Sequence, residues 1–74
     1  MTRPNQLKIV IASDVDYEKL IAEIYCDDEF IALIHQENGM QDLQVEFHIK
    51  TKSISLEWLQ IALQEARDKL TGEK

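Results

Sequence analysis

The sequence predicts an α+β domain, in which a four-stranded antiparallel β-sheet packs one C-terminal α-helix on one of its faces. Three observations support this prediction. Two runs rich in isoleucine and aromatic residues flank the short acidic segment Asp27-Asp28, residues 43–49 alternate apolar and polar side chains, and leucines recur at helical spacing after residue 55. Because the chain has 74 residues, we expect a single domain over residues 1–74.

The first strand is predicted over residues 7–12, a β-branched run in which Leu7, Ile9 and Ile11 share one face. Residues 13–19 are polar and turn-prone, so we expect a connecting loop there. Two further strands, over residues 20–26 and 29–36, form a hairpin around a two-residue turn.

The hairpin turn sets which side chains share a face. A two-residue turn at Asp27-Asp28 places Tyr25 opposite Phe30 and Ile24 opposite Ile31. The turn lacks an Asp-Gly or Asn-Gly pair, so a register shifted by one residue, which would exchange the faces, stays open. In the preferred register one face carries Ala22, Ile24, Cys26, Ile31 and Leu33, and the other carries Ile21, Glu23, Tyr25, Phe30, Ala32 and Ile34.

The fourth strand is predicted over residues 43–49, after a turn at Asn38-Gly39, with Leu43, Val45, Phe47 and Ile49 facing inward. The helix is predicted over residues 56–70, with Ser55 as its N-cap and Gly72 just past its end. Its apolar stripe contains Leu56, Leu59, Leu63, Ala66 and Leu70, and we expect Trp58, off this stripe, to pack on the end of the sheet.

A single helix has one apolar stripe and covers one face of the sheet, so the other face stays open. In the preferred register that face exposes Ile21, Tyr25, Phe30 and Ile34 beside Glu23 and Glu46. So much apolar surface indicates a partner or dimer interface, unless the register is shifted and these residues belong to the core.

Charge is distributed unevenly along the chain, whose formal net charge is −6. Residues 13–46 contain ten acidic residues and one base, Lys19, whereas the two flanks together carry a charge of +3. This asymmetry indicates an acidic interaction surface, with a plain solvated surface as the alternative. Nucleic acid is excluded as the expected partner because the lysines and arginines are scattered rather than massed on one segment.

The sequence contains no constellation typical of catalysis, metal binding or cofactor binding. His35 and His48 are the only histidines, and neither has the converging partners that a general base or a metal ion needs. The acidic tip at residues 27–29 lacks the alternating spacing of a calcium loop. Cys26 is the single cysteine, which we expect to be a small buried apolar residue. We therefore expect no enzyme activity, no metal and no cofactor.

Two kinds of feature that the sequence lacks, a pair of cysteines and a long apolar segment, predict the compartment of the protein and whether it binds membranes. A single cysteine permits no intramolecular disulfide, which fits a reducing compartment. No signal peptide begins the given sequence, and no apolar run approaches the ~18 residues of a membrane span. We expect a cytoplasmic protein that does not bind membranes.

Three segments carry a resemblance to a known family: residues 17–25, residues 30–37 and residues 55–66. Across residues 7–70 the chain resembles the small immunity proteins that are encoded beside the toxins of bacterial contact-dependent and Rhs-type systems. It departs from that pattern at the hairpin tip, where the family usually has a glycine and this chain has Asp27-Asp28-Glu29. The resemblance implies a cytosolic antidote that binds the C-terminal toxin domain and blocks its active site.

An acidic surface suits this role, because toxins that act on nucleic acids carry basic clefts and complementary charge accelerates encounter. Apolar anchors would then slow dissociation. The runner-up hypothesis is a non-enzymatic adaptor or structural domain that forms a homodimer through the exposed sheet face. The residues predicted to contact a partner are Glu23, Tyr25, Asp27, Asp28, Glu29, Phe30, Glu46 and Trp58.

Overall fold

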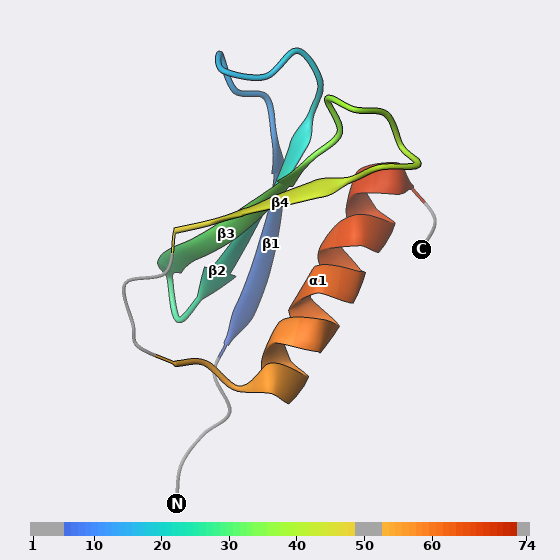
Figure 1. Cartoon of the computed structure of the whole chain (residues 1–74). Coiled ribbons are helices and arrows are strands. Elements are labelled where there is room, and N and C mark those ends of the chain that lie inside the picture. The colour runs from blue at the N-terminus through green and yellow to red at the C-terminus, as the bar shows by residue number, and fades with distance from the viewer. Residues whose placement is uncertain (1–5, 49–52, 73–74) are drawn as a thin grey trace, which may run out of the picture.

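A computed structural model describes residues 6–48 and 53–72 of the chain. Four strands, β1 (Leu7–Ala12), β2 (Ile21–Cys26), β3 (Glu29–His35) and β4 (Gln44–Phe47), precede one helix, α1 (Leu56–Thr71). The strands form an antiparallel sheet in the order β1-β2-β3-β4, and α1 lies on one face of it (Figure 1). The predicted fold class is confirmed. None of the described helical residues forms a segment long and apolar enough to cross a membrane.

The helix packs against β1 and β2 through small side chains. Ala62 and Ala66 are fully buried, and they belong to the same core cluster as Ala22 and Ile24 of β2. Because alanine lacks a long side chain, the helix axis can approach the sheet closely at these positions. Larger side chains, those of Trp58, Leu63 and Leu70 on α1 and of Leu43, Ile54, Leu7 and Ile9 elsewhere, pack around this cluster.

Both ends of α1 have the predicted caps. The Trp58 N–H donates a hydrogen bond to Ser55 Oγ at 3.2 Å, and Gly72, at φ 77°, closes the C-terminus with its N–H bonded to the Asp68 carbonyl. The predicted apolar stripe is wrong at one position, because Leu56 is 69% exposed. The buried line of the helix passes through Ala62, which lies about 120° around the helix from Leu56.

The hairpin register agrees with the prediction at the tip and differs beyond it. Tyr25 pairs with Phe30 as predicted, but Ile24 pairs with Ala32 and not with Ile31, because a β-bulge interrupts the ladder between Ile24 and Tyr25. Ile31 is the additional residue, and both Ile31 and Ala32 belong to the helix-side core.

The bulge changes the predicted faces of β3 but leaves those of β2 unchanged. Ile34 pairs with Ala22 and therefore lies on the helix side, where it is buried. Leu33 pairs with Glu23 and lies on the opposite face. The predicted faces are thus correct for Ile31 and wrong for Ala32, Leu33 and Ile34.

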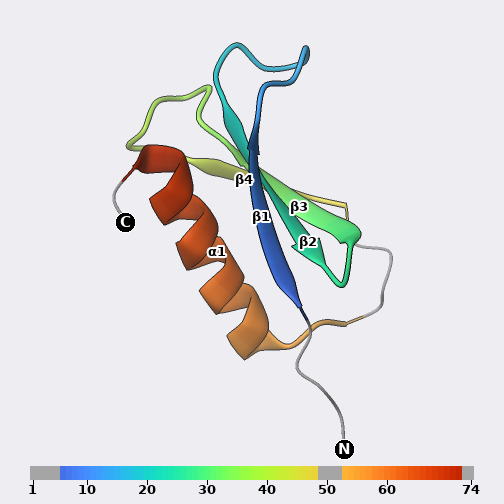
Figure 2. The ribbon, with the colours of Figure 1, turned by 180° about the vertical axis from the view of Figure 1, so that it is seen from behind.

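The fourth strand is shorter than predicted, and Ile49 lies outside the described residues. Val45 pairs with Ile34 and Phe47 with Ala32, so both are on the helix side as predicted. They are nevertheless 37% and 53% exposed, because α1 packs against β1 and β2 at the other edge of the sheet (Figure 2).

Candidate protein-binding surface

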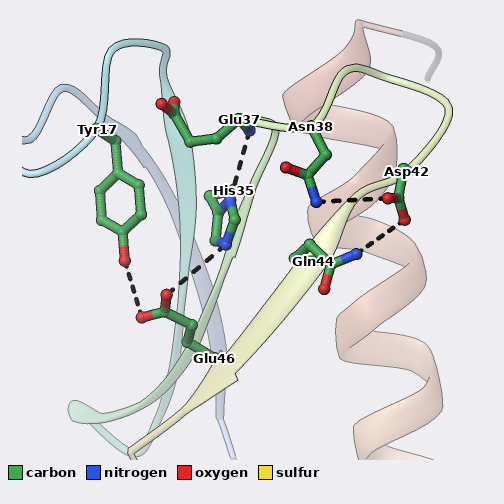
Figure 3. A network of polar contacts seen from close by, with 7 residues as sticks. All are labelled: Tyr17, His35, Glu37, Asn38, Asp42, Gln44 and Glu46. Atoms are coloured by element: carbon green, nitrogen blue, oxygen red, sulfur yellow. Dashed lines mark hydrogen bonds and ion pairs between the residues drawn. The ribbon is translucent and has the colours of Figure 1, made fainter.

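The sheet face opposite α1, called the open face below, is crossed at one end by the side chain of Tyr17. Its hydroxyl donates a hydrogen bond to Glu46 Oε1 on β4 at 2.8 Å, and its ring stacks on His35 of β3 with centroids 5.2 Å apart (Figure 3). Glu46 Oε2 lies 3.7 Å from His35 Nε2, and the Glu37 N–H donates to His35 Nδ1 at 3.4 Å. Glu46 therefore joins the loop before β2 to the third strand.

This contact accounts for two properties of the open face. The hydrogen bond to Glu46, followed by burial and by the nearby carboxylates of Glu46, Asp14 and Asp16, raises the pKa of Tyr17 to about 12. Ile21 and Leu33, which lie on the same face, are 0% and 6% exposed. The predicted exposure of Ile21 is therefore wrong, because the open face is covered at this end by a loop to which the sequence assigned no role.

The two loops at this end of the sheet, residues 13–20 and 36–43, are braced against each other. The Lys19 N–H donates to Glu37 Oε2 at 3.1 Å, and Gln36 Nε2 donates to the Leu20 carbonyl at 2.9 Å. Within the second loop, Asp42 accepts hydrogen bonds from Asn38 and Gln44 (Figure 3). These bonds fix loops that would otherwise be mobile connections.

Aromatic rings line the other end of the open face. Phe30 lies between Tyr25, with centroids 5.6 Å apart, and His48, with centroids 5.0 Å apart, while Lys8 Nζ lies 5.8 Å from the centroid of Tyr25. The Tyr25 hydroxyl donates to Glu23 at 3.0 Å, and this bond raises the pKa of Tyr25. Tyr25 and Phe30, predicted as contacts, thus lie side by side, and Lys8 and His48 extend the row across the sheet.

The hairpin tip has the backbone of a type I′ turn, since Asp27 and Asp28 have φ values of 53° and 72°. Asp27 is engaged within the chain: its Oδ1 accepts the Gln6 N–H at 2.8 Å, and its own N–H donates to the Gln6 carbonyl at 2.9 Å. The carboxylates of Asp28 and Glu29 are exposed and form no hydrogen bond or ion pair with the described residues. Asp28 therefore displays its charge from a strained backbone conformation.

The helix side of the tip contains a pocket of about 450 Å³, which is lined by Cys26, Asp27, Glu29, Ile31, Ser53, Ile54 and Ser55. Burial raises the pKa of the Cys26 thiol, and the carboxylates of Asp27 and Glu29 raise it further. A protonated thiol is a poor nucleophile. Among residues 6–48 and 53–72, no group of three or more histidine, cysteine, aspartate or glutamate side chains could hold a metal ion.

The eight predicted contact residues do not form one continuous surface. Four of them lie on the open face: Glu23, Tyr25, Phe30 and Glu46. Asp27 and Asp28 lie at the border of this face, in the turn between β2 and β3. Glu29 pairs with Cys26 and faces the helix side, and Trp58 packs against the helix-side core. Sequence reasoning missed Tyr17, whose partner Glu46 lies 29 residues away, beyond the reach of any local pattern.

The chain was compared with family models, with curated proteins and with solved structures. No family model matches it, and neither the curated proteins nor the solved structures gave a match.

Proposed function

We propose that this chain is an immunity protein, which binds a cognate bacterial toxin domain in the cytoplasm and neutralises it by covering a basic cleft. In this proposal the chain contributes no chemistry of its own. The observation that carries it is the place of the charge: the ten acidic residues of segment 13–46 lie in the two loops, on the open face and at the hairpin tip. The resemblance of the sequence to immunity proteins supports the same role.

The hydrogen bonds of the structure divide these ten carboxylates into two groups. One group is engaged within the chain and maintains the fold: it consists of Asp14, Glu23, Asp27, Glu37, Asp42 and Glu46. The side chains of Asp16, Glu18, Asp28 and Glu29 form no hydrogen bond or ion pair with the described residues. The carboxylates of the second group can replace their hydrogen bonds to water with contacts to a basic partner, and this replacement breaks no bond that stabilises the domain.

The backbone of Asp28 is an independent reason to assign the hairpin tip a role in binding. A type I′ turn favours glycine where φ is positive, and an aspartate costs conformational energy at 72°. Local strain of this kind accumulates at functional sites, where the side chain is needed for another purpose. A carboxylate held at the tip would increase the rate of encounter with a positively charged partner.

The half-buried rings of Tyr25 and Phe30 would supply the apolar part of the contact. Aromatic side chains in the centre of an interface contribute most of its binding energy, and exposed charges at the rim chiefly affect the association rate. Tyr25 and Phe30 lie on adjacent strands directly before and after the tip, so one partner surface could contact the rings and Asp28 together.

The experiment begins with a tagged chain, which is used to capture its partner from lysate of the producing organism, with identification by mass spectrometry. The purified pair is then compared with the Asp28→Asn/Glu29→Gln variant and with Glu57→Gln/Glu65→Gln, a control that removes the same charge from α1. We expect the first variant to associate at least about fivefold more slowly at low salt and the control to associate as the unmodified chain does.

Capture of a toxin domain whose activity the chain inhibits would support the proposal. Equal association rates for both variants would contradict the contact at the tip, and the absence of any basic protein partner would contradict the function. The runner-up hypothesis, self-association through the open face, loses part of its basis, because Ile21 and Ile34 are buried and add no apolar area to that face.

A further inference from the structure

The loop between β3 and β4 contains an asparagine followed by a glycine, Asn38-Gly39, to which the proposed function assigns no role. The chain has two asparagines, and the other, Asn5, precedes a glutamine. Glycine has no Cβ, so its backbone nitrogen can approach the side chain of the preceding residue without a steric clash. An asparagine before glycine is therefore the position most prone to spontaneous deamidation, a reaction in which the backbone nitrogen attacks the side-chain amide.

The structure leaves Asn38 accessible to this reaction. Its side chain is exposed, and none of residues 36–42 is buried. Gly39 has a φ of 98°, and a methyl group placed on its Cα would meet no atom within 4 Å beyond its two neighbours in the chain. The space beside the Gly39 backbone is therefore open.

Two hydrogen bonds hold the pair while the loop is closed. The Gly39 N–H donates to the Gln36 carbonyl at 3.0 Å, and Asn38 Nδ2 donates to Asp42 Oδ2 at 3.4 Å (Figure 3). The first bond keeps the proton on the nitrogen that must attack, and the Asp42 carboxylate repels the negative charge that develops there. The reaction must therefore begin from molecules in which the loop has opened. Segments with few buried contacts open locally at a low free-energy cost.

We propose that Asn38 is a site of spontaneous deamidation, which proceeds from the opened loop. Hydroxide removes the amide proton of Gly39, and the nitrogen attacks Asn38 Cγ. A bond forms between these two atoms, the bond from Cγ to Nδ2 breaks, and Nδ2 takes a proton from water and leaves as ammonia. Water then opens the cyclic imide. Attack of water at Cγ gives aspartate, and attack at the backbone carbonyl carbon of residue 38 gives isoaspartate.

Both products change the charge and the bonding of the loop. Each adds one negative charge to a chain whose net charge is −6. The new carboxylate replaces the amide that donates to Asp42, so an attraction becomes a repulsion between like charges. Isoaspartate also lengthens the backbone by one carbon atom between Gln36 and Gly39, and the hydrogen bond that closes this turn is then lost.

The same turn carries the side chains that brace the two loops. Glu37 accepts the Lys19 N–H, and Gln36 donates to the Leu20 carbonyl. Loss of the turn would release both contacts, so deamidation would loosen the loop of residues 13–20 as well. This inference is independent of the proposed function, since the reaction needs no partner.

Incubation of the folded chain in mildly alkaline buffer, followed by peptide mapping with mass spectrometry, tests the proposal. We expect aspartate and isoaspartate to accumulate at residue 38, at a rate that rises with the hydroxide concentration, while Asn5 stays unmodified and serves as the internal control. The chain unfolded in urea should react faster at residue 38, because both hydrogen bonds of the closed loop are then absent.

Two variants test the part played by Asp42. Asp42→Ala removes the acceptor of the Asn38 amide and should accelerate the reaction about two- to tenfold, the range that one hydrogen bond accounts for. The matched control, Gln44→Ala, removes the other bond of Asp42 and should change the rate less than about twofold. Circular dichroism verifies that both variants remain folded.

Two results would overturn the proposal. One is a folded chain that stays unmodified at Asn38 over a period in which the chain in urea is converted. The other is conversion of Asn5 as fast as that of Asn38. Equal rates for Asp42→Ala and Gln44→Ala would contradict the restraint that Asp42 exerts on the asparagine.

Discussion

At Asp28, the glycine variant should be more stable than the alanine variant. At an exposed position of the helix, the order of stability should be reversed. Asp28 has φ 72°, where an L-residue with a Cβ costs about 1–2 kcal/mol. Glycine avoids this cost but loses about 0.5–1 kcal/mol more backbone entropy on folding. The net expectation is that Asp28→Gly is more stable than Asp28→Ala by about 0.5–1 kcal/mol. At Glu65, an exposed helical position, glycine should instead be less stable than alanine by about 1 kcal/mol.

The four variants can be compared by urea unfolding, with the circular dichroism of α1 as the signal. A domain of this size has a urea dependence near 1 kcal/mol per molar, so the difference at Asp28 corresponds to a shift of about 0.5–1 M in the midpoint. If Asp28→Ala equalled or exceeded Asp28→Gly in stability, Asp28 could not have a positive φ. The type I′ turn, and with it the pairing of Tyr25 with Phe30, would then be wrong.

Three further predictions concern the hydrogen bond of Tyr17 to Glu46, the packing of α1 on the sheet and the hairpin tip. Ultraviolet titration should detect one tyrosine that ionises near pH 12, and this ionisation should be missing from the Tyr17→Phe variant. Because the hydrogen bond to Glu46 raises the pKa of Tyr17 above the unfolded value of 10, the contribution of this bond to the free energy of unfolding should be intact below pH 10 and decline between pH 10 and 12. Ala62→Leu should lower the free energy of unfolding by about 1–3 kcal/mol in thermal melts, since the fully buried position has no room for three more carbons, and an unchanged melting temperature would contradict close packing of the helix. Asp27→Ala should cost about 1 kcal/mol through loss of the bond to the Gln6 N–H, whereas Asp28→Asn should be nearly neutral; equal effects on urea unfolding would refute the distinction between these two aspartates.

The sequence was sufficient for the element types because each has a local signal. Strict alternation assigned Val45 and Phe47 to the helix side, and Ser55 and Gly72 marked the helix ends. The faces of β3 could not be predicted, since residues 30–34 are all apolar and contain no alternation. A bulge inside such a run exchanges faces without leaving a signal in composition.

The candidate surface was predictable only in part, for a related reason. Tyr25 and Phe30 are adjacent across a hairpin, and their contact follows from the turn. The bonds of Tyr17 to Glu46 and of Asp27 to Gln6 join residues 29 and 21 positions apart, and they depend on how the loops fold over the finished sheet. Such contacts decide which carboxylates are engaged and which are available, so local patterns cannot separate the two groups.

The strand order β1-β2-β3-β4 has a consequence for how the chain folds. Every strand pairs with its sequence neighbours, so the sheet requires only short loop closures, and the docking of α1 onto β1 and β2 is the step that joins the most distant parts of the chain. Mixed domains dominated by contacts at short sequence separation fold on the order of milliseconds, far faster than a ribosome adds a residue. The hairpin at Asp27-Asp28 could form while the helix is still being synthesised. An inhibitor with this topology would be active almost as soon as its synthesis ends.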